Sequence, residues 1–344
     1  MTAALPAGRL PGTAIVLAGI PALLLSIGVA VTLGPADLSL ADVGSVVADR
    51  LGLLETGVSR IGQGIVWQLR LPRALLAAVC GSGLGVCGAV LQSVLRNPLA
   101  DPFLLGVSAG ASTGAVSIVV LGLGGGVVGL TAGAFAGALV AFALVMLLAA
   151  LAGGATGHTV LAGVAGTQLF SALTSYIVIT SADAEQTRGV LFWLLGSLSG
   201  ARWNDVALAG AVCAGCLVLC QSRAAALDAF AFGQDAAASL GVRVARLRLV
   251  LLVATALLAA TLVAAAGAIG FVGLVLPQAA RLLVGPRHRV LLPVTAVLGA
   301  VLLVWVDVLA TTIAAPQEVP VGVVTALVGV PAFAVLLVRR GRMS

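Results

Sequence analysis

The sequence predicts an all-α protein that crosses a membrane about ten times. Of its 344 residues, 61% are apolar and only 9% are charged, and the mean hydropathy is +1.20. A soluble domain usually has about a quarter of its residues charged, so this composition excludes an ordinary cytosolic domain, a disordered chain and a nucleic-acid-binding protein. The chain also contains long apolar runs of about 20 residues, the length at which a helix spans a bilayer.

The apolar runs are expected to form ten helices within one transmembrane domain, residues 1–344. The first run is too long for the core of a signal peptide, so we expect it to be retained as a span. The eighth is short, and the half-length run Val190–Leu198 is expected at the membrane interface or as a re-entrant segment. The ten expected helices are 13–33, 71–94, 104–123, 127–152, 159–180, 205–221, 249–269, 271–284, 290–313 and 321–338.

Arginine-rich loops are retained in the cytoplasm, and this rule predicts that both termini are cytoplasmic. With the N-terminus inside, the inner loops hold twelve arginines and three acidic residues, and the outer loops hold six arginines and nine acidic residues. The longest inner loop is predicted at 222–248. Asp307 is expected near the outer end of its span, as a structural or a path-lining residue, and His158 and His288 are expected in water-exposed inner loops.

The residue types disfavour several binding chemistries. All 18 basic residues are arginine, so the lysine of a phosphate-binding P-loop is missing, and any ATP used must bind to another chain. Cys213 and Cys216 have the spacing of a metal or redox site. Because no histidine or carboxylate lies near them in the sequence, we interpret them as small apolar packing residues. We predict no metal site and no cofactor.

Glycine spacing predicts close helix packing. Two sets recur every fourth residue, namely Gly106, Gly110 and Gly114, and Gly129, Gly133 and Gly137. Such faces let helix backbones approach closely in lipid. The run Gly83-x-Gly85-x-x-Gly88 matches a dinucleotide fingerprint, but it lies inside an apolar span and follows no predicted strand. We interpret it as a packing motif as well.

Two arginines precede the second span, on the side expected to be outside. Arg70 and Arg73 belong to the segment Gln68-Leu-Arg-Leu-Pro-Arg73, in which Pro72 suits the first turn of a helix. Their flexible side chains could simply reach the membrane interface. Alternatively, they could dock an acidic partner surface, since guanidinium pairs with carboxylate in a bidentate manner.

Three further polar segments interrupt the apolar background. Two prolines break the chain in the turn Arg96–Pro102 between the second and third spans. The Ala-rich run Asp235–Leu240, followed by Gly241, predicts a short cytoplasmic helix whose apolar residues require a protein partner. Glycines and Pro277 within 267–278 predict a broken span that faces protein or a water-filled path.

Seven motifs occur in order from about Trp67 to Arg340. They are Arg70-Leu-Pro-Arg73, Arg96-Asn-Pro-Leu-Ala-Asp-Pro102, Leu104-Leu-Gly-Val-Ser108, Trp193-Leu-Leu-Gly-Ser-Leu198, Ser239-Leu-Gly-Val242, Gly270-Phe-Val-Gly-Leu-Val-Leu-Pro277 and Val319-Pro-Val-Gly-Val-Val-Thr-Ala326. Together they resemble the permease subunits of type II ATP-binding-cassette (ABC) importers, which take up iron(III)-siderophores, haem and cobalamin. No single motif would be specific, but the series in this order is.

The resemblance implies ten helices per subunit and two permease subunits, identical or sister chains, around a central path in the membrane lipid. Each subunit would dock a cytoplasmic ABC ATPase, and an extracytoplasmic substrate-binding protein would deliver the substrate. The chain itself would hold no catalytic residue. Arg70 and Arg73 would dock the binding protein. The cytoplasmic gate would comprise Asn97, Pro98, Leu99, Thr156 and Gly157, and the coupling to the ATPase would use Asp235, Ala236, Ser239, Leu240 and Gly241.

Two positions depart from the family pattern. Gln278 stands where the family often has histidine, and Thr311 follows Asp307-Val-Leu-Ala310 where the cobalamin branch has arginine, so docking is expected to use fewer salt bridges. We therefore expect a subunit that carries an iron(III)-siderophore across the bacterial cytoplasmic membrane by alternating access, with haem or cobalamin as alternatives. A secondary transporter would need coupling-ion ligands in mid-membrane, and an intramembrane enzyme would need a catalytic pair or metal cluster there. Neither is visible in the sequence.

Overall fold

The computed structural model describes residues 12–34, 36–122, 129–181, 183–230, 233 and 243–341, and all regular elements within them are helical. This confirms the predicted all-α fold class. The α-helices are α1 Gly12–Thr32, α2 Leu40–Arg50, α3 Arg60–Gly64, α4 Leu71–Val94, α5 Val107–Leu121, α6 Leu130–Leu151, α7 Thr156–Ser181, α8 Ala184–Leu194, α9 Trp203–Ser222, α10 Ala224–Phe230, α12 Val244–Ala266, α13 Val272–Val284, α14 His288–Thr312 and α15 Val321–Gly341. A π-helical segment, η1, covers Ile65–Arg70, and a 3-10 helix, η2, covers Pro102–Leu105.

Each of the ten predicted apolar runs forms a helix. Among the described residues, seven helices are long and apolar enough to cross a membrane: α1, the continuous helix Arg60–Val94, α6, α7, α9, α12 and α14. The other three runs form the shorter apolar helices α5 and α13 and the apolar stretch Val321–Val335 of α15. The prediction that the eighth run is short is confirmed by α13, which has 13 residues.

The second span begins earlier than the sequence predicts. Helix runs without interruption from Arg60 through η1 into α4, a total of 35 residues. Pro72 is the second residue of α4, in its first α-helical turn as predicted, but η1 precedes that turn, so Pro72 lies inside a continuous helix. In η1 the turn is wider, and the Leu71 N–H donates to the carbonyl of Val66, five residues back. This π-bulge lets the helix pass a proline that has no N–H to donate.

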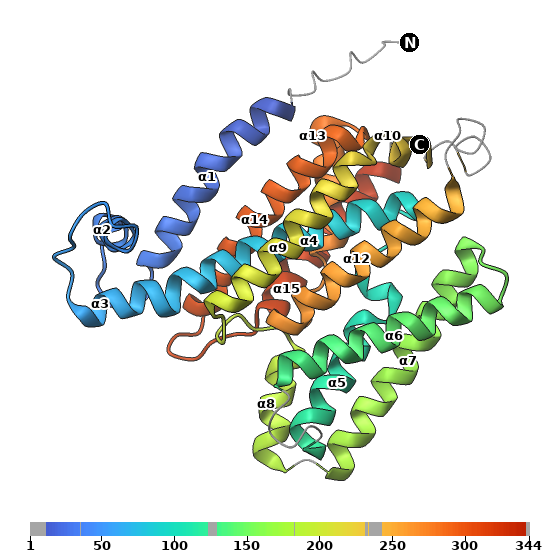
Figure 1. The fold of residues 1–344 in the computed structure, drawn as a ribbon, viewed down its shortest axis with the longest axis horizontal. Coiled ribbons are helices and arrows are strands. Elements are labelled where there is room, and N and C mark those ends of the chain that lie inside the picture. Colours follow the sequence, from blue (N-terminus) through green and yellow to red (C-terminus); the bar gives the residue numbers. More distant parts are fainter. Residues whose placement is uncertain are drawn as a thin grey trace.

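Glycines bring α4 against the backbones of α13 and α14. Gly81 lies against the Gly299 carbonyl and Gly88 against the Gly273 carbonyl, with no space for a Cβ at either. The Gly83-x-Gly85-x-x-Gly88 run thus occupies the buried middle of α4, where it packs helices as predicted. Together α4, α13 and α14 form the tightly packed centre of the larger group of helices (Figure 1).

A second group consists of α5, α6 and α7, with α8 beside them (Figure 1). Gly110 and Gly114 of α5 approach the carbonyls of Gly137 and Gly133 of α6, and again no Cβ would fit. The prediction of close backbone contact is confirmed for these four glycines, whereas Gly106 lies against side chains of α6 and Gly129 has open space around it. The half-length run that begins at Val190 forms only the C-terminal part of α8, whose N-terminus is capped by the Asp183 side chain.

The predicted broken span is confirmed between α12 and α13. Gly267 ends α12 with φ +70°, and Phe271 precedes α13 with φ +67°. The Ser197 N–H donates to the carbonyl of Ala266, the last residue of α12, and Gly196 lies against the Ala268 carbonyl in the break. Irregular backbone inside a membrane is stable only when its polar groups are bonded by protein or water, so these contacts support the break.

Candidate transport sites at the two ends of the bundle

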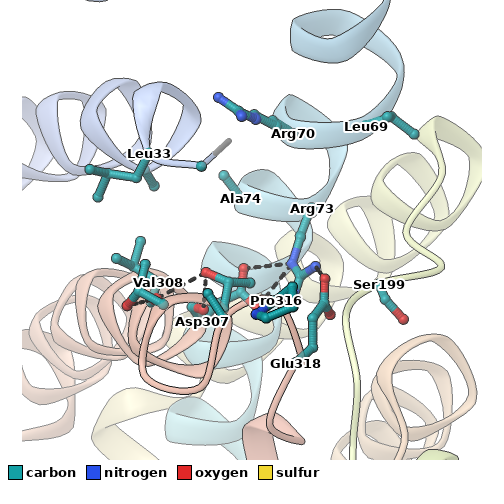
Figure 2. A pocket seen from close by; sticks show the side chains of 15 residues that line it. Leu33, Leu69, Arg70, Arg73, Ala74, Ser199, Asp307, Val308, Pro316 and Glu318 are labelled. Atoms are coloured by element: carbon teal, nitrogen blue, oxygen red, sulfur yellow. Dashed lines mark hydrogen bonds and ion pairs between the residues drawn. The ribbon is translucent and has the colours of Figure 1, made fainter. Parts of the chain in front are cut away.

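Arg73 joins three separate parts of the chain at the end predicted to be outside. Its Nε and Nη2 donate to both carboxylate oxygens of Asp307 in α14, at 2.9–3.1 Å, and its Nη1 donates to Glu318 Oε1 at 2.8 Å (Figure 2). Asp307 is only 7% exposed. The Asp307 carboxylate is thus a structural partner of Arg73, and it also lines the cavity described below.

Arg70 contacts a different helix. Its Nη1 donates to the carbonyls of Val31 and Thr32 at 2.9 and 3.2 Å, which are the last carbonyls of α1. A cation is favourable there because the C-terminal carbonyls of a helix lack intrahelical partners and carry a partial negative charge. The Arg70 side chain points away from the Arg73–Asp307 pair (Figure 2).

The two arginines line one cavity of about 720 Å³. Besides Asp307 and Glu318, its wall includes Thr311, the position for which the sequence comparison with the cobalamin branch led us to expect arginine. The Thr311 hydroxyl donates to carbonyls of its own helix, so it adds no charge to the cavity. An incoming carboxylate would therefore meet Arg70, and it would meet Arg73 only in competition with Glu318. The Glu318 side chain is 37% exposed, against 10% for that of Asp307.

Sequence reasoning missed an aromatic pair formed by Trp67, on the same continuous helix as these arginines, and Trp203, the first residue of α9. The Trp203 indole N–H donates to the Trp67 carbonyl at 2.8 Å, and the two rings lie 4.8 Å apart. The Arg50 guanidinium stands 5.8 Å from the Trp67 ring centroid, within cation–π range. The sequence offers no spacing signal for this contact, because the two tryptophans are 136 residues apart.

At the opposite end, the turn after α4 has the local structure that its residues predict. The Leu99 N–H donates to the Asn97 side-chain oxygen at 2.9 Å, and the Phe103 N–H donates to Asp101 Oδ1 at 2.9 Å. These are Asx-type turns. Arg96 has φ +47° and Gly106 has φ +74°. Burial raises the pKa of the Asp101 carboxyl to about 6.

Gln92, Gln278 and Arg281 form a polar cluster behind this turn, which sequence reasoning also missed. The Gln278 amide donates to Gln92 Oε1 at 3.1 Å and to the Pro98 carbonyl at 3.0 Å. Arg281 donates to the same Gln92 oxygen, and the Gln92 amide donates to the Gly273 carbonyl. The Gln278 side chain thus connects α13 directly to the turn by a hydrogen bond. The available signals were Gln278, a departure from the family pattern, and Gln92, an amide near the end of an apolar run.

Thr156 and Gly157 open α7, where Thr156 is partly buried and Gly157 is exposed. Gly163 in the same helix lies against the Leu104 carbonyl of η2 without room for a Cβ. This contact joins α7 to the 3-10 helix that follows the Asn97 turn. The structure therefore links the segments that carry the two predicted parts of the gate.

Two further outcomes concern residues at this end. The predicted coupling residues Asp235, Ala236, Ser239, Leu240 and Gly241 lie outside the described residues. The expectation that His288 lies in a water-exposed loop is wrong, because it is the first residue of α14 and is 4% exposed. His158 lies in the first turn of α7 and is exposed.

All five cysteines are buried, in α4 and α9. The Cys213 thiol lies 4.0 Å from the Ser82 hydroxyl, and the Cys216 and Cys220 sulfurs are 3.9 Å apart. These thiols pack between helices, as interpreted from the sequence.

Comparison with known proteins decides the family. The sequence profile described as the FecCD transport family matches residues 22–339. The chain belongs to this family. It is therefore a permease of the type II ABC importer class, and, as the composition predicts, an integral membrane protein. The end-to-end match also agrees with the motif series found in the sequence.

The names of similar proteins give different substrates. The "Cobalamin import system permease protein BtuC" of Halobacterium salinarum is 40% identical over 83% of this chain and 76% of its own length. The "Probable siderophore transport system permease protein YfiZ" of Bacillus subtilis is 38% identical over 80% of this chain and 83% of its own. A solved metal-chelate type ABC transporter in an inward-facing conformation superimposes with a TM-score of 0.84 at 30% identity, covering 95% of this chain and 99% of that chain.

Proposed function

We propose that this permease carries an iron(III)-siderophore across the bacterial cytoplasmic membrane by alternating access, with both termini in the cytoplasm. It acts as one of two permease subunits, driven by separate cytoplasmic ABC ATPases and supplied by an extracytoplasmic binding protein. Relatives named for cobalamin and for siderophore are equally similar to it. The preference for a siderophore is supported by Thr311, which replaces the arginine of the cobalamin branch at the outer cavity.

The polar exposed face of α7 is the observation that supports a transport path. Gln168, Ser171 and Ser175 follow helical spacing and are all exposed, and α7 has the lowest mean hydropathy of the seven candidate spans, 1.4 against 1.7 to 2.6. Amides and hydroxyls facing hydrocarbon would lack hydrogen-bond partners. This face therefore lies against a second permease subunit or a water-filled path between the two subunits. Its side chains are neutral, which suits a chelate that encloses its metal charge.

The outer cavity supports docking of the binding protein at Arg70 and Arg73. A carboxylate of that protein would pair with Arg70 and displace Glu318 from Arg73, while Asp307 stays in place. At the other end, Asn97, Pro98, Leu99, Thr156 and Gly157 form the gate. The segment Asp235–Gly241 couples the gate to the ATPase, and Leu240→Pro should separate ATP hydrolysis from uptake.

Uptake of labelled iron-siderophores, haem and cobalamin by a deletion strain and its complemented partner tests the substrate. Loss of iron-siderophore uptake alone in the deletion strain supports the proposal. Loss of cobalamin or haem uptake alone would support the importer function but refute the siderophore assignment. No change for any of the three refutes all three substrate assignments.

Docking is tested by binding of the purified binding protein to the permease–ATPase complex. Arg70→Glu should weaken binding, most strongly at low salt, because complementary charge raises the association rate. Glu318→Gln should strengthen binding, since it removes the competing carboxylate. Glu185→Gln, an exposed acid on α8, is the matched control and should leave the affinity unchanged. Unchanged affinity in both Arg70→Glu and Glu318→Gln would remove this cavity from the docking surface.

A further inference from the structure

Asp228 connects α10 to α14 and, through one imidazole, to α4. Asp228 Oδ1 accepts the backbone N–H of His288 at 2.8 Å, and it lies 2.6 Å from the His288 ring Nδ1. The carboxylate therefore caps the first turn of α14, where negative charge is favourable. The other ring nitrogen, Nε2, lies 2.6 Å from Ser93 Oγ in the last turn of α4. Since His288 is buried, neighbouring side chains hold the imidazole in this bridging position.

The end of α4 that receives this bridge leads directly into the first gate turn. Ser93 stands four residues before Asn97, and the Asn97 N–H donates to the carbonyl of Gln92, next to Ser93. A displacement of α10 would thus act through His288 on the residues that position Asn97 and Leu99. Hydrogen bonds that involve a charged group are short and directional, which suits them to transfer a displacement.

Arg248 makes the corresponding connection on the other side of the loop. It lies in the second turn of α12, and its Nη1 donates to the Gly154 carbonyl while its Nη2 donates to Thr159 Oγ1, both at 2.8 Å. Gly154 has φ +71° in the turn between α6 and α7, and Thr159 is buried in the first turn of α7. The guanidinium therefore binds residues on both sides of Thr156 and Gly157.

We propose that Asp228 and Arg248 are positioning residues that separately connect the two sides of the proposed ATPase-coupling segment Asp235–Gly241 to the two halves of the cytoplasmic gate. Asp228 precedes this segment in the sequence and holds the Asn97 turn, and Arg248 follows it and holds the Thr156 turn. The two connections share no residue. This inference rests on the proposed function, which assigns the gate and the coupling role.

Cysteine labelling in the complete permease–ATPase complex tests the two connections independently. Leu99→Cys and His158→Cys place one reporter in each gate half, at residues that are exposed, whereas the native thiols are buried. The reaction rate of each reporter with a membrane-impermeant maleimide is compared without nucleotide and with ATP and vanadate. We expect Asp228→Asn to abolish the nucleotide-dependent change at Leu99→Cys only, and Arg248→Gln to abolish it at His158→Cys only.

Further variants separate this role from a general structural one. Arg246→Gln, an exposed arginine one helical half-turn before Arg248, should preserve both responses. Ser93→Ala, which removes the far partner of His288, should reproduce the effect of Asp228→Asn. Retention of both responses in Asp228→Asn and Arg248→Gln, or loss of both in either one, would overturn the proposal. Absence of any nucleotide response in the parent reporters would instead refute the proposed gate, and with it this inference.

Discussion

The Arg73–Asp307 pair makes the most quantitative prediction. Arg73→Met removes the guanidinium and leaves the Asp307 carboxylate buried without its bidentate partner. Removing one partner of a buried ion pair typically destabilises a protein by about 3–5 kcal/mol. The Arg73 side chain is 16% exposed, so partial solvation of the site places the expected loss of unfolding free energy near the lower end, at about 3 kcal/mol.

The assay is unfolding of the purified permease in mixed micelles, with helix content followed as denaturing detergent is added. Arg60→Met is the matched control, because Arg60 opens the same continuous helix and is exposed; it should change the unfolding free energy by less than about 0.5 kcal/mol. In the double variant Arg73→Met with Asp307→Leu no buried charge remains unpaired. Most of the loss should therefore be recovered.

Two results would contradict this reasoning. A loss below about 1 kcal/mol for Arg73→Met would place the pair among exposed salt bridges, which stabilise little. If the loss in the double variant equalled the sum of the losses in Arg73→Met and Asp307→Leu measured separately, the two side chains would not be coupled. In either case Arg73 would be free to serve a docked partner at little cost to the fold.

Three further predictions use the same unfolding measurement. The pKa of the Asp101 carboxyl is raised to about 6 from its ordinary value of 3.8, so the folded state binds more protons than the unfolded state between these two pH values. The free energy of unfolding should therefore fall by on the order of 2 kcal/mol as the pH rises from 4 to 6. Asp101→Asn should remove this pH dependence. Gly114→Ala should destabilise by about 1–3 kcal/mol, since its Cβ meets the α6 backbone, whereas Gly215→Ala, with open space around it, should be neutral or stabilising. Trp203→Phe should lose about 1 kcal/mol with its bond to Trp67, and an unchanged stability would show that this bond contributes nothing.

The positions of the helices could be predicted from the sequence because each depends on local hydrophobicity. A run of apolar residues becomes a helix in lipid wherever it occurs, since every backbone group must be bonded within the segment. The glycine contacts of Gly110 and Gly114 could be predicted for the same reason, because four-residue spacing fixes a helix face. The break after α12 followed from its glycines.

The pairings between distant charges could not be predicted. Arg73 and Asp307 are 234 residues apart, and His288 and Asp228 are 60 residues apart, so helix packing alone brings them together. The sequence therefore left two roles open for Asp307 and placed His288 in water. The extension of the second span back to Arg60 was missed because Pro72 usually opens a helix, and only the π-bulge of η1 makes it compatible with a continuous one.

The distribution of contacts indicates where a conformational change would occur. Backbone-to-backbone glycine contacts make α4, α13 and α14 one tightly packed group and α5 and α6 another, since neither leaves space for helices to shift. The groups are connected through α12, which packs on both α4 and α6, through η2, which packs on α7 and α12, and through Arg248 of α12. Relative movement of the groups would change the turn 95–106, which is one of the segments that link them covalently and contains the positive-φ residues Arg96 and Gly106. The proposed gating at Asn97 would then depend on the glycine packing, because rigid groups concentrate movement in the segments that connect them.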